Sequence, residues 1–284
     1  MSVQTPPTLL KLARQALLRD EALAMSSVEE LPRELFPALF KEALDGRKTM
    51  LIKTMVAAWP FPCLPVGALM VTPDLETLKA VLDGVDMRLT REFHPRCLRK
   101  PLETLSITHY QISQSDLDSF SCSQRLFQLK HLDMRGIILL LLDIMPLKVL
   151  LENLADTLQS LDLKGCRMSN SQLTVLIPAL SHCSKLTKVN FYNNNFSMPI
   201  LKDFLRHTAN LNKLNVEQYP APLECYDDLG ALSTELFVQL CAELMDTLLA
   251  VRQPKNISFA SEVCVRCRER CVYALGPRLC LCWQ

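Results

Sequence analysis

Apolar residues recur at a regular spacing along much of this chain. The pattern L-x-x-L-x-L-x-x-N/C-x-L, with other apolar residues at some leucine positions, fits five frames that follow one another at nearly equal intervals. The L-x-L part of a frame is typical of a short strand, and the interval lies near the long end of the range typical of leucine-rich repeats. The sequence therefore predicts an α/β fold, a leucine-rich repeat solenoid over residues 102–250. The frames start at Leu102, Leu129, Leu158, Leu186 and Leu211.

Polar residues alternate with the apolar ones in each predicted strand, so they are expected on the opposite, concave face. Solenoids bind partners on such faces, although a solvated face without a partner would have the same composition. In the fifth frame this alternation places Val216 in the core and Glu217 on the concave face. The residues favoured for partner binding are His131, Asp133, Arg135, Asp162, Lys164, Lys188, Asn190 and Tyr192.

The sequence also predicts a helix between two of the frames and turn residues within them. Leu173–Leu180 has the apolar spacing of a helix, as expected between two strands of a repeat. Asn194 and Cys166 occupy the ninth position of their frames, where they are expected to bond backbone groups of the turn, whereas Tyr110 and Ile137 depart from this rule.

Residues 1–93 lack the repeat and are predicted to form an N-terminal helical module, followed by a junction over residues 94–101. One helix is expected to run from Thr8 through Leu17. Ser26 and Ser27, followed by Glu29 and Glu30, resemble a capping box that would open a second helix.

Composition narrows the function classes. Leucine occupies 54 of 284 positions and glycine only 7, and no glycine-rich phosphate loop occurs. Basic and acidic residues balance at 31 and 30, which does not favour direct binding of nucleic acid. The longest apolar run is far shorter than the ~20 residues that span a bilayer. We therefore expect no membrane contact and an intracellular protein of the cytoplasm, with the nucleus as a second location.

Several segments resemble one family. The run LLKLARQALLRDEALAMSSVEELPRELFPALFKEALDGR, then AAWPFPCLPVGALM, and later PLETLSITHYQIS and ALSHCSKLTKVNFYNNNFS are similar to the PRAME family, leucine-rich proteins named for a melanoma antigen. Its members are longer, and the central repeats are missing here between about Phe93 and Pro101. The resemblance thus implies a truncated or alternatively spliced form, whose uncovered first repeat is expected to lower stability.

The resemblance also implies a role as substrate receptor of a cullin-2 ubiquitin ligase, in which ubiquitin transfer would occur on other subunits and this chain would not be an enzyme. Two short motifs fit that role. The elongin-binding box matches Thr8, Leu9, Ala13 and Leu17, and the cullin box matches Leu31, Pro32, Leu35 and Leu39. The expected partners are elongin B/C and cullin-2.

Each motif has an alternative interpretation. The same leucines can simply pack the helical module, and the L-P-x-E-L start at Leu31 also resembles an F-box, which would recruit a Skp-type adaptor. Leu147, Leu150 and Leu151 form an L-x-x-L-L box of the kind that docks on a nuclear receptor or other transcription regulator, but a repeat helix needs leucines at these positions for its core.

Five of the twelve cysteines fall between Cys264 and Cys282. A C-x-x-C followed by a second close pair can supply four thiolates to a structural zinc, with free thiols in a loosely ordered tail as the alternative. The resemblance favours a quartet without Cys271 within a cysteine-rich tail, residues 251–284. The candidate ligands are Cys264, Cys267, Cys280 and Cys282, and no other cofactor is expected.

Two functions remain open from the sequence. The first is a protein-interaction adaptor of the ligase, for which the resemblance implies negative regulation of transcription, differentiation and apoptosis and positive regulation of proliferation. The second is a passive leucine-rich repeat scaffold or a non-functional truncated form.

Overall fold

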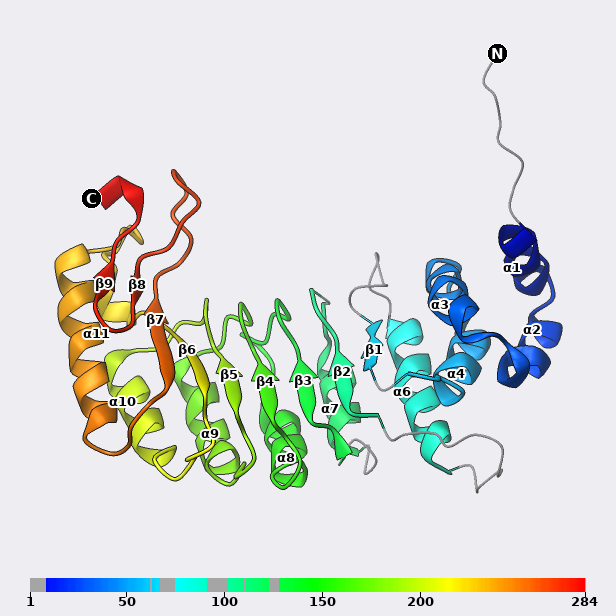
Figure 1. Ribbon diagram of the computed structural model, residues 1–284, viewed down its shortest axis with the longest axis horizontal. Coiled ribbons are helices and arrows are strands. Elements are labelled where there is room, and N and C mark those ends of the chain that lie inside the picture. Colours follow the sequence, from blue (N-terminus) through cyan, green and yellow to red (C-terminus); the bar gives the residue numbers. More distant parts are fainter. Residues whose placement is uncertain are drawn as a thin grey trace, which may run out of the picture. The chain divides into compact units, whose positions relative to one another are not determined.

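The computed structural model describes residues 9–61, 63–66, 75–90, 102–109, 111–122 and 128–283 (Figure 1). The chain forms two compact units, unit 1 (Met1–Pro101) and unit 2 (Leu102–Gln284). The predicted junction, residues 94–101, lies outside the described residues. No helix in the described parts of the chain is long and apolar enough to cross a membrane.

Unit 1 is mainly helical. Its core contains an aromatic cluster in which the rings of Phe36 and Phe40 lie 6.1 and 4.9 Å from that of Trp59, and the Trp59 indole N–H donates to the carbonyl of Cys63 at 2.8 Å. The elements are α1 (Leu9–Arg19), α2 (Glu21–Ser27), η1 (Val28–Glu30), η2 (Arg33–Leu35), α3 (Phe36–Asp45), α4 (Thr49–Ala57), β1 (Cys63–Pro65) and α6 (Leu75–Thr90).

The predicted capping box at Ser26 and Ser27 is wrong. These serines end α2, and the Ser26 hydroxyl donates back to the carbonyl of Leu23. Ser27 directly precedes the short η1, but its side chain makes no cap hydrogen bond. The N-cap of α2 is Asp20, whose carboxylate accepts the N–H of Leu23 at 3.0 Å. An acidic N-cap upstream therefore takes the role that the sequence pattern assigned to the serines.

Helices α4 and α6 approach each other closely at Gly84. A Cβ atom at this position would lie 2.6 Å from the carbonyl oxygen of Lys53 and 2.7 Å from the Cβ of Val56. Beside this contact, the Lys53 ammonium pairs with Asp83 at 3.0 Å. Gly84 is therefore required by packing, because no larger side chain fits between the two helices.

Unit 2 is a mixed α/β structure in which short strands alternate with helices, as the apolar period predicts. Figure 1 shows the helices in a layer on one face of the sheet. The parallel strands are β2 (Thr104–Ser106), β3 (His131–Asp133), β4 (Ser160–Asp162), β5 (Lys188–Asn190), β6 (Val216–Pro220) and β7 (Asn256–Ala260), and the antiparallel β8 (Val272–Tyr273) and β9 (Pro277–Arg278) follow them. The remaining elements are α7 (Gln114–Cys122), α8 (Met145–Asn153), α9 (Asn170–Ser181), α10 (Met198–His207), η4 (Leu223–Cys225), α11 (Thr234–Leu249) and η5 (Leu281–Trp283).

The register of the parallel strands follows the first four frames. Leu105, Leu132, Leu161 and Val189 face one another in successive strands and are buried. Each strand thus adds one apolar side chain to a continuous row, and the helix that follows covers it. A single strand and helix could not bury this row alone.

The fifth frame is displaced from its predicted position. Val189 pairs in register with Glu217, so the frame begins at Leu214, which is as far along the chain from Leu186 as Leu186 is from Leu158. Glu217 is therefore fully buried instead of lying on the concave face. The predicted position was wrong because Leu211, Leu214 and Val216 happen to have the apolar spacing of a frame.

The parallel ladder also continues beyond residue 250, where the sequence prediction ended it. Strand β7 pairs with β6 in parallel from Val216↔Asn256 to Pro220↔Ala260. Part of the predicted tail, residues 251–284, is thus a further strand of the sheet.

A row of turns ends the strands of unit 2. One residue with a positive φ angle follows each strand at the same position of successive strand–helix segments. These residues are His109, Gly136, Gly165 and Asn193, with φ angles of 55°, 72°, 71° and 59°. The backbone N–H groups of His109, Gly136 and Gly165 each donate at 2.8 Å to a carbonyl in the next strand–helix segment. This repeated left-handed turn directs the side chains around it to one edge of the sheet.

Candidate functional site

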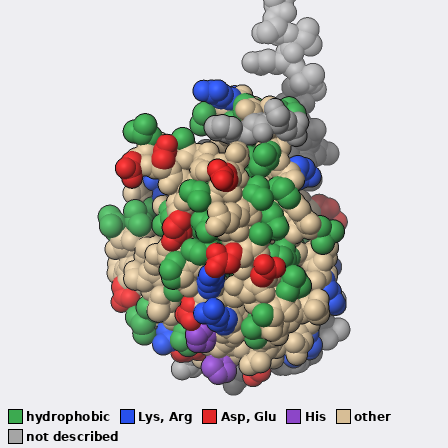
Figure 2. All heavy atoms as spheres, turned by 90° about the vertical axis from the view of Figure 1, so that its left-hand side faces the viewer, with side chains coloured by type: hydrophobic (Ala, Val, Ile, Leu, Met, Phe, Trp, Pro, Cys, Tyr) green, Lys and Arg blue, Asp and Glu red, His purple; other side chains and the backbone are tan. Residues whose placement is uncertain are grey.

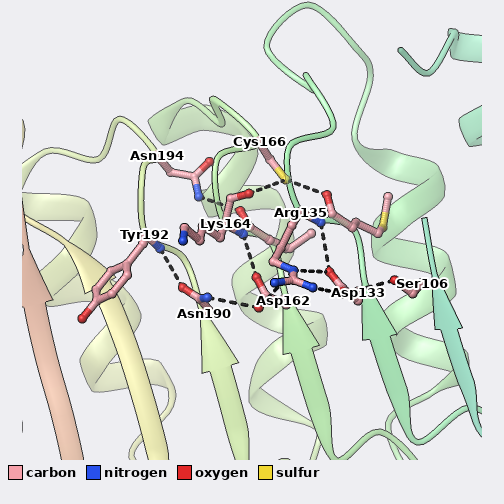
Figure 3. A network of polar contacts seen from close by, with 11 residues as sticks. Ser106, Asp133, Arg135, Asp162, Lys164, Cys166, Asn190, Tyr192 and Asn194 are labelled. Atoms are coloured by element: carbon pink, nitrogen blue, oxygen red, sulfur yellow. Dashed lines mark hydrogen bonds and ion pairs between the residues drawn. The ribbon is translucent and has the colours of Figure 1, made fainter. Parts of the chain in front are cut away.

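Some of the polar residues predicted on the concave face have a structural role at the carboxyl ends of the strands. Asp133, Asp162 and Asn190 lie in register at the last position of β3, β4 and β5. Each side chain accepts the backbone N–H two residues later, at 3.2, 3.1 and 3.1 Å (Figure 3). Aspartate and asparagine recur here because their short side chains close this turn.

Hydrogen bonds and ion pairs join these side chains across the strands (Figure 3). Arg135 donates from Nε and Nη2 to the carboxylate of Asp133 at 2.9 and 2.7 Å, and its Nε lies 3.8 Å from Asp162. Asn190 donates to Asp162 at 3.1 Å, and Ser106 donates to Asp133 at 3.2 Å. The hydrogen bond to Asp133 raises the pKa of Arg135, whose side chain remains 49% exposed. The network thus holds a permanent cation at the surface in one orientation.

The turns and this network border a groove of about 730 Å³. Three of its lining side chains, those of Arg135, Lys164 and Arg167, are cationic and one, that of Glu262, is acidic, and Arg135 is paired with Asp133 and Asp162. The lining residues are His109, Arg135, Gly136, Ile138, Leu140, Lys164, Gly165, Arg167, Asn193, Asn195, Glu262 and Val263.

Arg270 connects the part of the groove formed by Glu262 and Val263 to the turns of the sheet. Its guanidinium lies 5.5 Å from the centre of the Tyr192 ring and donates to Asn193 and to the carbonyl of Ser261 at 2.6 and 2.8 Å. Burial lowers the pKa of Arg270. The Tyr192 hydroxyl in turn lies 2.6 Å from that of Ser258 in β7. Residues 258–270 therefore contribute to this site as well as the residues predicted on the concave face.

Only Arg135 and Lys164 of the predicted partner-binding residues line the groove. Asp133, Asp162, Asn190 and Tyr192 support it through the network, whereas His131 and Lys188 begin β3 and β5, at the opposite ends of the strands. His109 and Asn193 also line the groove and were not predicted, although they occupy the same place in their frames as Gly136 and Gly165.

Asn194 and Cys166 bond backbone groups as predicted. The Asn194 amide donates to the carbonyls of Leu163 and Phe191, both at 2.9 Å, and its oxygen accepts the N–H of Met168. The Cys166 thiol donates to the carbonyl of Met134 at 3.2 Å, and burial raises its pKa to about 12. Both side chains therefore hold the turns beneath the groove.

Asp162 destabilises the native state to an extent that depends on pH. Burial raises its pKa, because the carboxylate leaves water for a site that supplies only partial compensation. The native state then holds the proton to higher pH than the unfolded chain does, so this residue lowers stability progressively as pH rises through its native pKa.

We therefore expect Asp162→Asn to stabilise unit 2 at pH 7 more than at pH 4. Asparagine can still accept the N–H of Lys164, as Asn190 accepts the N–H of Tyr192. Urea unfolding of both proteins at the two pH values measures the difference, with Asp156→Asn on an exposed turn as the control. A gain that is equal at both pH values would contradict this origin.

The elongin-box and cullin-box residues lie in unit 1. Thr8 is outside the described residues, Leu9 is the first residue of α1, Ala13 is exposed and Leu17 is half-buried. In the cullin box, Leu31 is half-buried and Pro32 exposed, whereas Leu35 and Leu39 are buried in the core. Of the motif residues whose side chains are described, only Ala13 and Pro32 are exposed.

Two other motifs have a packing role. Leu147, Leu150 and Leu151 are fully buried in unit 2, which bears out the core interpretation of the L-x-x-L-L box. Cys183, next to His182, is also fully buried, and burial raises the pKa of its thiol to about 12. This cysteine is therefore a core residue.

The fold brings together the four cysteines predicted as a quartet. The sulfurs of Cys264, Cys267, Cys280 and Cys282 all lie within 4.8 Å of one another. Backbone N–H groups of Cys267 and Arg266 face the sulfur of Cys264 and lower its pKa to about 6. The cluster lies near the groove in sequence, since Glu262 and Val263 immediately precede Cys264.

Known proteins resemble both units. Residues 6–110 match the PRAME N-terminal domain and residues 80–282 match the PRAME C-terminal domain. PRAME family members 8 and 7 of Homo sapiens are each 31% identical over 474 aligned positions that cover 99% of this chain and 100% of the relative, and oogenesin-3 of Mus musculus is 28% identical over 467 positions that cover 96% of this chain and 93% of the relative. Since this chain has 284 residues, at least 190 of the 474 positions face gaps in it. The chain belongs to the PRAME family.

Proposed function

We propose that this chain is a protein-interaction adaptor whose strand–helix units are leucine-rich repeats and whose groove binds a protein partner. The observation that supports this most is the groove itself, where Arg135 is held at the surface by Asp133 and Asp162. Side chains that are fixed before binding lose less entropy when a partner arrives, so such a surface suits recognition. Family membership supports a role in protein interaction.

The finer role that we propose is substrate recognition for a cullin-2 ubiquitin ligase, with α1 as the contact for elongin B/C. On α1, Ala13 is exposed and small, which allows another helix to come close. The buried Leu35 and Leu39 cannot contact cullin-2 directly without rearrangement, so the turn at Leu31 and Pro32 would carry that contact. The chain then needs no chemistry of its own, and effects on transcription, differentiation, apoptosis and proliferation would follow from the proteins it recruits.

One binding experiment with two variants separates the two surfaces. Ala13→Glu places a charge in the middle of the proposed elongin contact, and Arg167→Glu reverses a charge in the groove. We expect Ala13→Glu to weaken binding of purified elongin B/C at least about tenfold, the effect of ~1.4 kcal/mol, because a buried unpaired charge is costly. We expect Arg167→Glu to leave elongin binding unchanged and to lose protein partners captured from cell extract by the unaltered chain.

The matched controls are Gln15→Glu on the other side of α1 and Lys185→Glu on an exposed turn of unit 2. Neither is expected to change either kind of binding. If the unaltered chain binds neither elongin B/C nor cullin-2, the ligase role is wrong, and binding of a Skp-type adaptor would replace it with the F-box role. If partners are retained by Arg167→Glu as fully as by Lys185→Glu, the groove is not the recognition surface and the passive scaffold is favoured.

A further inference from the structure

The C-terminal segment, residues 262–282, is folded with little apolar burial. Within it, Cys271 and Cys280 are buried, whereas Val265, Leu275 and Leu281 are exposed. Figure 2 shows this end of the molecule, where apolar side chains are interspersed with charged ones at the surface. A segment without a core of its own requires another stabilising element, such as a disulfide or a metal.

The first pair of cysteines lies on a tight turn. The N–H of Arg268 donates to the carbonyl of Cys264 at 2.9 Å, and the N–H of Cys264 donates to the carbonyl of Glu269 at 2.8 Å. Arg268, directly after Cys267, has a φ of 59°. This turn brings the sulfurs of Cys264 and Cys267 to the same side of the chain.

The second pair reaches the first through the hairpin of β8 and β9. Val272 pairs with Ala260 of β7 and with Arg278 of β9, so the chain returns along the edge of the sheet (Figure 1). Cys280 and Cys282 follow β9 closely, and the sulfurs of Cys282 and Cys264 lie 3.8 Å apart. The sheet itself thus brings together two cysteines that are distant in sequence.

The spacing of the sulfurs fits a tetrahedral metal. Zinc–sulfur bonds of about 2.3 Å in a tetrahedron place neighbouring sulfurs about 3.8 Å apart, and all four sulfurs here lie within 4.8 Å of one another. The segment between the first and third ligands carries four arginines and one glutamate, and its net positive charge offsets the net negative charge of one divalent cation with four thiolates. The arginines are Arg266, Arg268, Arg270 and Arg278, and the glutamate is Glu269.

The fifth cysteine of the segment has a different role. Cys271 is buried, and its sulfur accepts the N–H of Cys280 at 3.3 Å. It therefore positions the strand that leads to the third ligand and lies outside the quartet.

We propose that Cys264, Cys267, Cys280 and Cys282 bind one Zn²⁺ in a closed structural site. Each thiol that binds loses its proton to solvent, and the four sulfurs leave no open position for catalysis. The metal joins the turn after Val263 to the end of the β8–β9 hairpin, so it holds the wall of the groove that Glu262 and Val263 form. This site is independent of the ligase role, since it concerns the fold of unit 2.

Metal content of the full chain tests the proposal. The chain is purified under reducing conditions without chelator, and zinc is measured by mass spectrometry against protein concentration. We expect about one equivalent in the unaltered chain, in Cys63→Ala and in Cys271→Ser, and less than about one tenth of an equivalent in the double variant Cys264→Ala, Cys267→Ala. Cys63 is an exposed cysteine of unit 1 and serves as the matched control.

Two measurements on the unaltered chain keep the test decisive if the double variant does not fold. Replacement of zinc by Co²⁺ is expected to give the visible absorption of a tetrahedral thiolate site. Chelation is expected to increase hydrogen exchange in residues 261–283 and not in β3 to β5. Zinc below one tenth of an equivalent with free thiols or a disulfide at these positions, zinc retained by the double variant, or no change in exchange on chelation would each overturn the proposal.

Discussion

Replacement of Arg252 by alanine is expected to destabilise unit 2 by about 3–5 kcal/mol, the usual cost of leaving a buried charge without its partner. The Glu217 side chain is fully buried and that of Arg252 is 6% exposed. Arg252 donates from Nη1 to Glu217 at 2.6 Å and from Nη2 to its other oxygen, and the Tyr219 hydroxyl donates to the same carboxylate at 2.8 Å. Removal of the guanidinium would leave the carboxylate charged in an apolar layer.

The contacts with Glu217 also shift the pKa values of Arg252 and Tyr219. Burial alone would lower the pKa of Arg252, but its hydrogen bonds and charge attraction to Glu217 raise it. Burial and the charge of Glu217 raise the pKa of Tyr219 well above its ordinary value. The arginine therefore stays charged and the tyrosine neutral throughout the pH range in which the protein is handled.

An apolar replacement of the whole cluster provides the control. Glu217 occupies a register position that Val189 and Ile257 fill in the neighbouring strands. The triple variant Glu217→Leu, Tyr219→Phe, Arg252→Met is thus expected to be as stable as the unaltered chain or more so. Urea unfolding followed by circular dichroism measures both variants. A loss below about 0.5 kcal/mol for Arg252→Ala would show that the carboxylate is not confined as described.

Replacement of Gly84 by alanine is expected to destabilise unit 1 by about 1–3 kcal/mol, the usual cost of overpacking. In an exposed helix the same change would stabilise by about 1 kcal/mol, because alanine is the better helix former. At Gly84 the added methyl group would meet the backbone of Lys53 at 2.6 Å, so α4 and α6 must separate. The sign of the effect therefore distinguishes the close contact from ordinary helix propensity.

Tryptophan fluorescence can follow unit 1 alone. Trp59 is buried in unit 1, and the second tryptophan, Trp283, can be removed by Trp283→Phe in all proteins compared. Gly276→Ala is the control, since a Cβ atom at that glycine meets nothing within 4 Å. Unaltered or increased unfolding temperature of Trp59 in Gly84→Ala would contradict the helix contact.

The alternating strands and helices of unit 2 could be predicted because their apolar spacing is regular. The fifth frame could not, since its decisive residue is a glutamate at a position that the pattern reserves for an apolar side chain. Glu217 is tolerated there only because Arg252, far along the chain, reaches it. A pairing between distant residues leaves no trace in a local period, so the pattern selected Leu211, Leu214 and Val216 instead.

In the candidate site, too, some residues could be predicted from local patterns in the sequence and others could not. Arg135 and Lys164 were predicted from the alternation along the strands, and the cysteine quartet from the C-x-x-C spacing together with the family resemblance. The part of the groove wall formed by Glu262 and Val263 was not found, because it depends on the return of the chain through β7. In unit 1, the cullin-box pattern could not reveal that Leu35 and Leu39 face the core, since apolar contact residues and apolar core residues look alike in sequence.

The way in which the strands pair has a consequence for the length of such proteins. From β2 to β6, successive strands pair with one another in parallel, and they are separated by nearly equal lengths of chain. Among the residues that the structure describes, no strand pairing closes this series on itself, so whole strand–helix segments can be lost while each remaining pair keeps its geometry. The at least 190 positions that face gaps here are enough for several such segments. A family built in this way can change the length of its sheet in discrete steps and keep one fold throughout.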